Sequence, residues 1–150
     1  MNSEYKPSLI FFLLSHHSPE KLNRTIHISI KGRHLYLCAR CTGVWTGMMS
    51  IFLAFFSVDL PAWLYVLLLA VLPAPATVDW ITQSCKLRES RNAIRIGSGF
   101  LLGVSWGLFF LSLTKGMLHL FLIGLAIICA YIFLIYIVAL KTKFLDNYFN

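Results

Sequence analysis

Charged side chains are scarce in this sequence, and acidic ones are the scarcest. Only 13% of the 150 residues are charged, with 6 Asp and Glu against 13 Lys and Arg. A soluble domain carries about twice that charged fraction. The deficit excludes an ordinary soluble domain. It also makes nucleic-acid binding a poor explanation of the net charge of +7, because no extended polar surface is available to carry it.

The chain also lacks low-complexity linkers, and its charge-free runs are long. Four of them reach the roughly 17 to 25 residues that a membrane helix needs. They contain 18, 19, 19 and 25 residues and extend over 41–58, 60–78, 96–114 and 116–140. The sequence therefore predicts an all-α membrane protein. We expect a four-helix transmembrane bundle over 41–150, a central cytoplasmic loop at about 79–95 and a cytoplasmic N-terminal segment over 1–40.

The first 40 residues lack the marks of a cleaved signal peptide. Their apolar stretch, Ser8–Leu14, has only 7 residues and no small-residue cleavage site before His16. Such a stretch favours a helix that lies on the membrane surface.

The positive charges are distributed unevenly along the chain. Of the 13 Lys and Arg, six precede the first span, four lie in the central loop and two follow the last span, which leaves only Lys115 for the other side. Positive residues are retained on the cytoplasmic face. We therefore expect a multi-pass protein of the cell inner membrane, with both termini cytoplasmic and in contact with anionic lipid.

Cysteine is rare, yet Cys38 and Cys41 stand three positions apart. Thiols on a cytoplasmic face stay reduced, which disfavours a disulfide. The pair can chelate a soft cation, and His16 and His17 would complete the tetrahedral shell of a zinc ion. Further candidate ligands between the two pairs are His27 and His34. A redox-active dithiol and two plain interfacial cysteines are the alternatives that stay open.

An acidic residue stands at the inner end of the second span. A carboxylate there is costly unless it is paired or faces water, so Asp79 is a candidate for function and for a catalytic role. Gln83 follows four residues later and would share its helix face. The alternative is structural: Asp79 would pair with an arginine of the central loop and fix the helical hairpin.

Arginines recur at helical spacing after that loop. On a helix, Arg88, Arg91, Asn92 and Arg95 would share one face at the membrane surface. Guanidinium groups bind phosphate or carboxylate through paired hydrogen bonds, so this face predicts an anion site. A simple cytoplasmic anchor would need the charges but not their alignment, and both interpretations stay open.

Small residues indicate how these groups could meet. Glycines at intervals of four, which allow close backbone approach in lipid, occur in the first and third spans. They are Gly43 and Gly47, and Gly99, Gly103 and Gly107. If these faces pack, Arg40 comes to lie beside the arginine face and joins the anion site together with Gln83. Pro73 and Pro75 predict a kink in the second span.

Taken in order, the motifs resemble those of a family of small prokaryotic integral membrane proteins of unknown function. The matching elements are Ser18-Pro19-Glu20, Cys38 to Gly43, Asp79 with Thr82-Gln83, and Arg88, Ser90, Asn92, Arg95, Ser98, Gly99 and Gly103. The resemblance implies a polytopic membrane protein and no activity. The chain departs from the family pattern at His16-His17, where the pattern has Cys-His, and at Trp80, where a glycine usually follows the aspartate.

The leading interpretation is a membrane protein that binds an anionic lipid or a phosphorylated ligand, with zinc as the cofactor. The first alternative is a metal-dependent enzyme acting on a lipid-linked or phosphorylated substrate, with Asp79 as the base. Against it, a zinc ion with four protein ligands has no open position. The second alternative is a small transporter, although few polar residues line the spans. The oligomeric state stays open.

Overall fold

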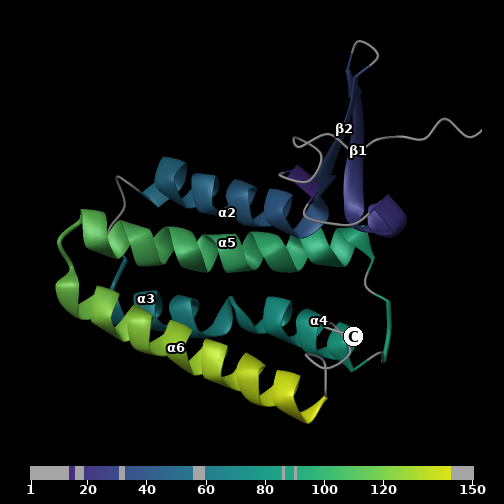
Figure 1. Ribbon diagram of the computed structural model, residues 1–150. Coiled ribbons are helices and arrows are strands. Elements are labelled where there is room, and N and C mark those ends of the chain that lie inside the picture. The colour runs from purple at the N-terminus through teal and green to yellow at the C-terminus, as the bar shows by residue number, and fades with distance from the viewer. Residues whose placement is uncertain are drawn as a thin grey trace, which may run out of the picture.

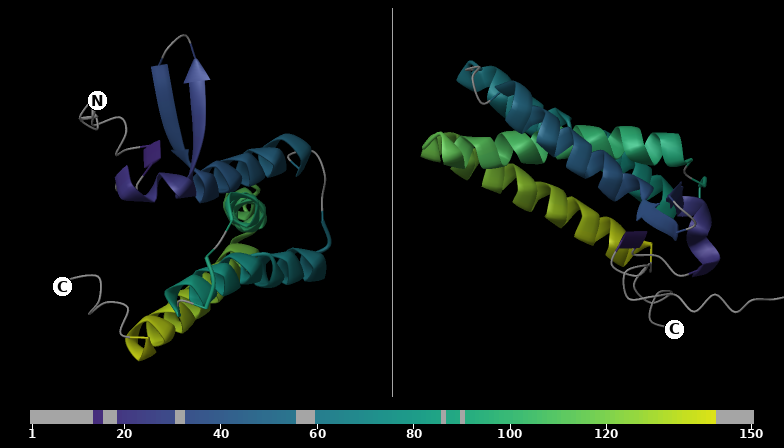
Figure 2. Two further views of the ribbon diagram at one scale, coloured as in Figure 1. Left: turned by 90° about the vertical axis from the view of Figure 1, so that its right-hand side faces the viewer. Right: turned by 90° about the horizontal axis from the view of Figure 1, so that it is seen from above.

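The computed structural model describes residues 14–15, 19–30, 33–55, 60–85, 87–89 and 91–142. The elements in chain order are a 3₁₀-helix η1 (Pro19–Arg24), strands β1 (Thr25–Ile30) and β2 (Arg33–Cys38), and helices α2 (Ala39–Phe55), α3 (Ala62–Val71), α4 (Ala74–Ser84), α5 (Asn92–Thr114) and α6 (Leu118–Lys141). The helices form one bundle, and the hairpin of β1 and β2 projects from one end of it (Figures 1 and 2).

Three helical segments are long and apolar enough to cross a membrane. They extend over Ala62–Ser84, which joins α3 and α4, and over Asn92–Thr114 and Leu118–Lys141. Helix α2 has 17 residues and ends at Phe55, just before residues outside the described ranges. The expectation of a mostly helical protein with several apolar spans is thus confirmed, and the count of four spans stays a prediction.

The N-terminal region contains a β-hairpin, so the expectation of an all-α fold is wrong there. Strands β1 and β2 pair antiparallel, from Thr25 opposite Cys38 to Ile30 opposite Arg33. Apolar residues alternate along β1 and only two residues separate the strands, which is the sequence pattern of a hairpin. The interpretation of residues 1–40 as a surface helix and a metal knuckle overlooked this alternation. The surface helix expected at 8–14 lies outside the described residues, apart from Leu14.

Pro73 separates α3 from α4, so the kink predicted in this span is confirmed. Proline has no N–H, and the carbonyl group of Leu69, four residues earlier, therefore cannot receive its helical hydrogen bond. It accepts one from Ser105 Oγ of α5 at 3.3 Å instead. The next carbonyl, of Ala70, accepts one from Tyr131 Oη of α6 at 2.6 Å. The helix break thus ties α3 to both neighbouring helices.

Helices α2 and α5 run parallel and touch along their backbones. A Cβ atom on Gly43 would lie 2.2 Å from the carbonyl oxygen of Ile96, and one on Gly103 would lie 2.1 Å from that of Val44. These positions leave no room for a side chain, which is how glycine permits close approach in lipid. The predicted contact of the two glycine faces is confirmed, and it places the start of α2 against the start of α5.

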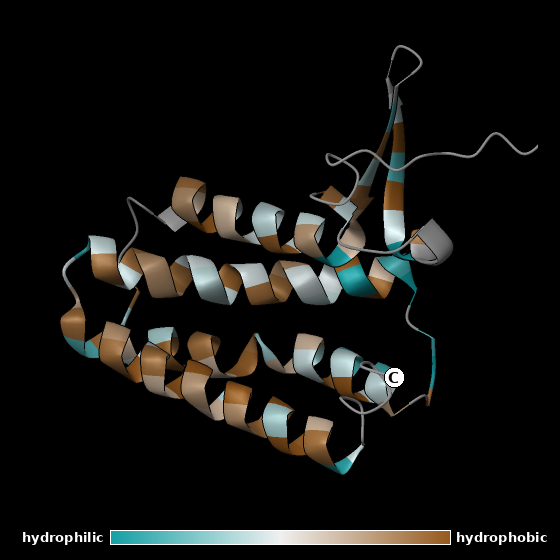
Figure 3. Ribbon diagram, in the orientation of Figure 1, coloured by the Kyte–Doolittle hydropathy of each residue, from teal (hydrophilic) through white to brown (hydrophobic). Residues whose placement is uncertain are grey.

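The rest of the interior is mainly apolar, with single buried hydroxyl residues such as Ser105 and Ser112, and most hydrophilic residues gather at the end of the bundle that bears the hairpin (Figure 3). The buried apolar core extends over α2, α3, α5 and α6 and consists of Ile51, Tyr65, Leu69, Leu108, Phe109, Leu111 and Leu120. Among the described residues, the buried charged side chains, Asp79 and Arg95, stand in α4 and in the first turn of α5, at the hairpin end.

Candidate functional site

Asp79 lies in α4 at the polar end of the bundle and is only 1% exposed. Its Oδ2 accepts hydrogen bonds from Arg40 Nη2 of α2 and from Gln83 Nε2, the latter at 2.8 Å. Its Oδ1 accepts one from Arg88 Nη2 at 3.0 Å. A carboxylate can stay ionised in such a buried place only with partners of this kind. The contacts hold α2, α4 and the following loop together.

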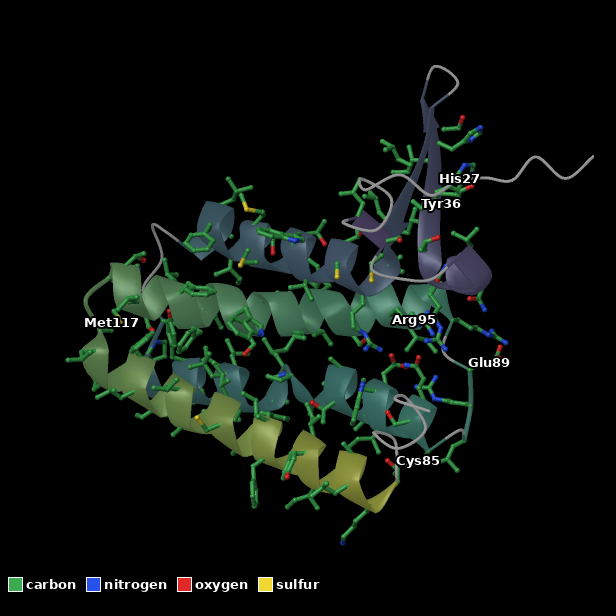
Figure 4. The ribbon with its side chains drawn as sticks, viewed as in Figure 1. His27, Tyr36, Cys85, Glu89, Arg95 and Met117 are labelled. Carbon is green, nitrogen blue, oxygen red and sulfur yellow. The ribbon has the colours of Figure 1, made fainter. Side chains whose placement is uncertain are left out.

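Gln83 connects this carboxylate to α5. It stands one helical turn after Asp79, as predicted, and its Oε1 accepts a hydrogen bond from Arg95 Nη2 at 2.8 Å. Arg95 is in the first turn of α5 and is 6% exposed. Its side chain extends from α5 toward the end of α4 (Figure 4). We call the five residues that these contacts join the arginine cluster: Arg40, Asp79, Gln83, Arg88 and Arg95.

The arginine cluster holds more positive than negative charge. It contains one carboxylate, which pairs with Arg40 and Arg88, and a third guanidinium group, of Arg95, which is bonded to Gln83; the excess is two positive charges. The buried Nε atoms of Arg40 and Arg95 have no hydrogen-bond partner among the described residues. An unsatisfied buried donor costs about 1–3 kcal/mol, and more if it is charged. The first turn of α5 adds the positive end of a helix dipole. The arrangement is suited chemically to hold an anion.

The structure does not form the predicted arginine face as one helical surface. Helix α5 begins only at Asn92, and Arg91 before it is extended, with φ −80° and ψ 150°. Arg88 reaches Asp79 from the loop. Asn92 points elsewhere, since its Nδ2 donates to the carbonyl oxygen of Thr25 in the hairpin at 3.1 Å. These side chains do not share one face because α5 begins only after Arg91, whereas their spacing predicted a helix that includes Arg88.

Cys38 and Cys41 lie where the hairpin joins α2. Cys38 ends β2, Cys41 is in the first turn of α2, and their side chains are hydrogen-bonded to each other. Both are free thiols. His16 and His17 lie outside the described residues. Within the described ranges, no group of three or more His, Cys, Asp and Glu side chains could hold a metal ion. The zinc site stays a prediction.

The two other candidate imidazoles pair with each other on the hairpin. His27 Nε2 and His34 Nδ1 are 2.9 Å apart, and the two rings are stacked with centroids 5.0 Å apart. Tyr36 also stacks on His27, at 4.8 Å, and both residues lie on the projecting hairpin (Figure 4). In the described part of the chain these imidazoles form an aromatic stack and no ligand group with the cysteines.

Two features of the site were absent from the sequence-based interpretation. One is the Thr25 carbonyl group that binds Asn92, which was missed together with the hairpin. The other is a cavity of about 310 Å³ beside the arginine cluster, with Arg40 in its wall and mostly apolar residues of α3 to α6 around the rest. Pro73, which lines this cavity, was recognised as a kink but not as part of a site.

Apolar helices in one bundle, with buried ion pairs at one end, define a multi-pass helical membrane protein. The chain belongs to the family described as "Predicted membrane protein (DUF2085)", whose model matches residues 19–110. The expected membership of a membrane protein family of unknown function is thereby confirmed.

Two archaeal relatives are similar to this chain. An "Uncharacterized protein" of Methanothermobacter thermautotrophicus is 32% identical over 113 residues, which cover 75% of this chain and 94% of the relative. "Uncharacterized protein MJ1492" of Methanocaldococcus jannaschii is 31% identical over 100 residues, which cover 63% of this chain and 59% of that protein. No solved structure matches the chain.

Proposed function

We propose that the arginine cluster binds an oxyanion, namely the phosphoryl or carboxyl group of a lipid or of a free ligand. The observation that carries the proposal is that the buried Nε groups of Arg40 and Arg95 have no hydrogen-bond partner in the part of the chain that the structure describes. Buried charges are stable only when paired, and Asp79 alone leaves two positive charges in excess. A phosphate group carries about −1.5 to −2 charges at neutral pH and offers several acceptor oxygens. It would satisfy both the charge and the two donors.

The source of the anion depends on the orientation in the membrane. We take α2 as a fourth span and place both termini and the arginine cluster at the cytoplasmic face of the inner membrane. In support, 12 of the 13 Lys and Arg stand in the sequence before Cys41, between Cys85 and Ile96 or after Leu140. The starts of α2 and α5 and the ends of α4 and α6 lie at one end of the bundle (Figure 1). The ligand would come from the cytoplasmic leaflet or the cytosol. Labelling of Cys85 from outside intact cells by an impermeant maleimide would contradict this orientation.

The substitution Arg95→Lys tests anion binding. It keeps the charge, and hence the orientation, but replaces a planar group with several donors by a point charge. We expect binding of phosphatidate, measured by native mass spectrometry of detergent-purified protein, to weaken about tenfold, or about 1.4 kcal/mol. Inorganic phosphate and diacylglycerol are titrated in parallel. Competition by phosphate alone indicates a free ligand, whereas phosphatidate binding without competition indicates a lipid.

Arg91→Lys is the matched control for this experiment. It is the same exchange four residues earlier, at an exposed position outside the arginine cluster. Its binding of phosphatidate and phosphate should equal that of the unaltered protein. If Arg95→Lys also binds both ligands as tightly as the unaltered protein, the arginines serve only as a topology signal and the proposal is wrong.

We also propose a zinc ion held by Cys38, Cys41, His16 and His17. The contact between the two thiols supports their role as half of a tetrahedral site. Because the ligands come from separate segments, metal binding and local folding should be coupled. Chelation should then increase proteolysis between His17 and Cys38, and elemental analysis should find no zinc in Cys38→Ser/Cys41→Ser. Stoichiometric zinc in that double variant would show that the assignment is wrong.

A further inference from the structure

The cavity beside the arginine cluster combines an apolar body with one charged end. Its volume is about 310 Å³, and among its lining residues only Arg40 is charged. Trp80, next to Asp79 at the end of α4, also lines it, and the lining continues along α6 from Ile135 to Gly124. The start of α2 and the ends of α4 and α6 lie at the same end of the bundle (Figure 1). The charged end of the cavity therefore coincides with the arginine cluster.

The hydroxyl groups in the cavity wall are already hydrogen-bonded within the protein. Thr77, Ser105 and Tyr131 line the cavity, and each donates to a backbone carbonyl oxygen of α3 or of Pro73. Two of these carbonyl groups lack helical partners because of the break at Pro73. Polar groups that are satisfied in this way do not require a polar occupant. Away from Arg40, the wall is suited to hydrocarbon and offers little to water.

The dimensions of the cavity fit one hydrocarbon chain. Gly124 and Ile135 are 11 residues apart on α6, which corresponds to roughly 16 Å at about 1.5 Å per residue. The hydrocarbon core of a bilayer is about 30 Å thick, so one leaflet is about 15 Å deep. The volume lies at the lower end of the roughly 300–1,000 Å³ of pockets that enclose a small ligand. A second chain would have to lie outside.

We propose that the anionic ligand is a single-chain lipid monophosphate whose hydrocarbon chain occupies this cavity. The inference rests on the proposed function, because Arg40 belongs both to the arginine cluster and to the cavity wall. The phosphate group meets the Nε atoms of Arg40 and Arg95, and the chain follows α6 away from the polar end. Charge complementarity at Arg40 distinguishes this ligand from a neutral lipid that merely covers an apolar face.

The four tryptophans allow a direct test, because two of them line the cavity and two do not. Trp80 and Trp106 are in the lining, whereas Trp45 and Trp63 are 63% and 69% exposed. A protein with Trp45→Phe/Trp63→Phe keeps the cavity pair, and one with Trp80→Phe/Trp106→Phe keeps the exposed pair. Lysophosphatidate with a brominated chain, which quenches tryptophan on contact, is the probe. We expect saturable quenching of the cavity pair and only gradual, non-saturable quenching of the exposed pair.

The substitution Ala76→Phe fills the cavity, and Ala130→Phe is its matched control. Ala76 is buried in the lining, while Ala130 is exposed on α6 outside it. In the background that keeps the cavity tryptophans, Ala76→Phe should weaken saturable quenching at least about tenfold, equivalent to about 1.4 kcal/mol. Ala130→Phe should have no effect. If Ala76→Phe does not fold, Ile132→Phe carries the same expectation, because Ile132 lines the cavity but is 61% exposed and tolerates a larger side chain.

The probes separate failure of this inference from failure of the proposed function. If inorganic phosphate binds and depends on Arg95, but brominated lysophosphatidate quenches both tryptophan pairs alike, the cavity holds no chain and this inference is wrong while the anion site stands. If brominated monoacylglycerol quenches the cavity pair as well as lysophosphatidate does, the phosphate contributes nothing and the inference is also wrong. If two-chain phosphatidate competes as strongly as lysophosphatidate, the restriction to one chain is wrong.

Discussion

Helices α5 and α6 have nearly the same length, 23 and 24 residues, but they occupy different surroundings. In their apolar windows, 50% of the residues of α5 are buried in the bundle and only 6% of those of α6 are. The helix in the interior is thus the one with more glycine and serine, while the helix on the outside consists largely of leucine, isoleucine and aromatic residues.

This difference reflects what drives packing in a membrane. Lipid tails are as apolar as leucine, so burying a large apolar side chain gains little, and close backbone contact and hydrogen bonds decide what lies inside. Helix α5 buries Ser98, Ser105 and Ser112 together with three of its four glycines, whereas Ile132 and Phe133 of α6 are exposed. Hydropathy identifies a span, but it does not identify the interior.

The largest expected loss of unfolding free energy comes from removing the carboxylate of Asp79, which Gln83 connects to Arg95 of α5. Asp79→Asn leaves Arg40 and Arg88 without their anionic partner, and such a broken buried ion pair costs about 3–5 kcal/mol. Reversible unfolding in mixed micelles should show a loss of this size. The control is Arg88→Gln at the more exposed edge of the cluster, where 39% of the side chain is exposed, and we expect a loss nearer 1 kcal/mol there. Equal losses would mean that the carboxylate is not the centre of the cluster.

A smaller loss should follow from adding one methyl group between α2 and α5. In Gly103→Ala the new Cβ would lie 2.1 Å from the carbonyl oxygen of Val44, which forces the helices apart at a cost of about 1–3 kcal/mol. Gly97→Ala is the control on the same helix, because nothing lies within 4 Å of its Cβ. There the better helix propensity of alanine should stabilise α5 by roughly 0.5–1 kcal/mol. The same unfolding assay measures both, and equal values would contradict the close contact.

The smallest loss of unfolding free energy is expected where α6 is attached to α3. Tyr131→Phe removes the hydrogen bond to the Ala70 carbonyl oxygen at 2.6 Å and should cost about 0.5–1.5 kcal/mol. Tyr136→Phe, on the exposed side of α6, should change the unfolding free energy by less than about 0.5 kcal/mol. If the two variants cannot be distinguished, α6 is held by apolar packing alone.

Features that depend on neighbouring residues were predictable from the sequence. The apolar spans follow from local composition, the break at Pro73 from the missing N–H, and the contact of the two glycine faces from a spacing of four residues. The hairpin was also within reach, because Ile26 and Ile28 in β1 alternate with polar residues as in a strand. The hairpin was not predicted because the His and Cys residues on either side favoured a metal site in this segment.

The arginine cluster was only partly predictable. Asp79, Gln83 and the arginines were recognised one by one, but the pairing of Asp79 with Arg40 joins residues 39 positions apart and depends on how three helices pack. One alternative from the sequence was that Asp79 pairs with an arginine of the central loop. Arg88 does so, and Arg40 and Gln83 bind the same carboxylate. The helical spacing of the arginines predicted one face wrongly, because α5 begins only at Asn92. The sequence has no clear signal that would have placed the start of the helix there.

The junction between the hairpin and α2 couples the two elements rigidly. Strand β2 ends at Cys38 and α2 begins at Ala39 with no linker between them, and the opposite strand is held at its base by the bond from Asn92 to Thr25. Arg40 is the second residue of α2. Because no flexible linker separates the strands from α2, a rotation of the hairpin would be transmitted directly to this helix. It would rotate the first turn of α2 and move the Arg40 guanidinium group relative to Asp79.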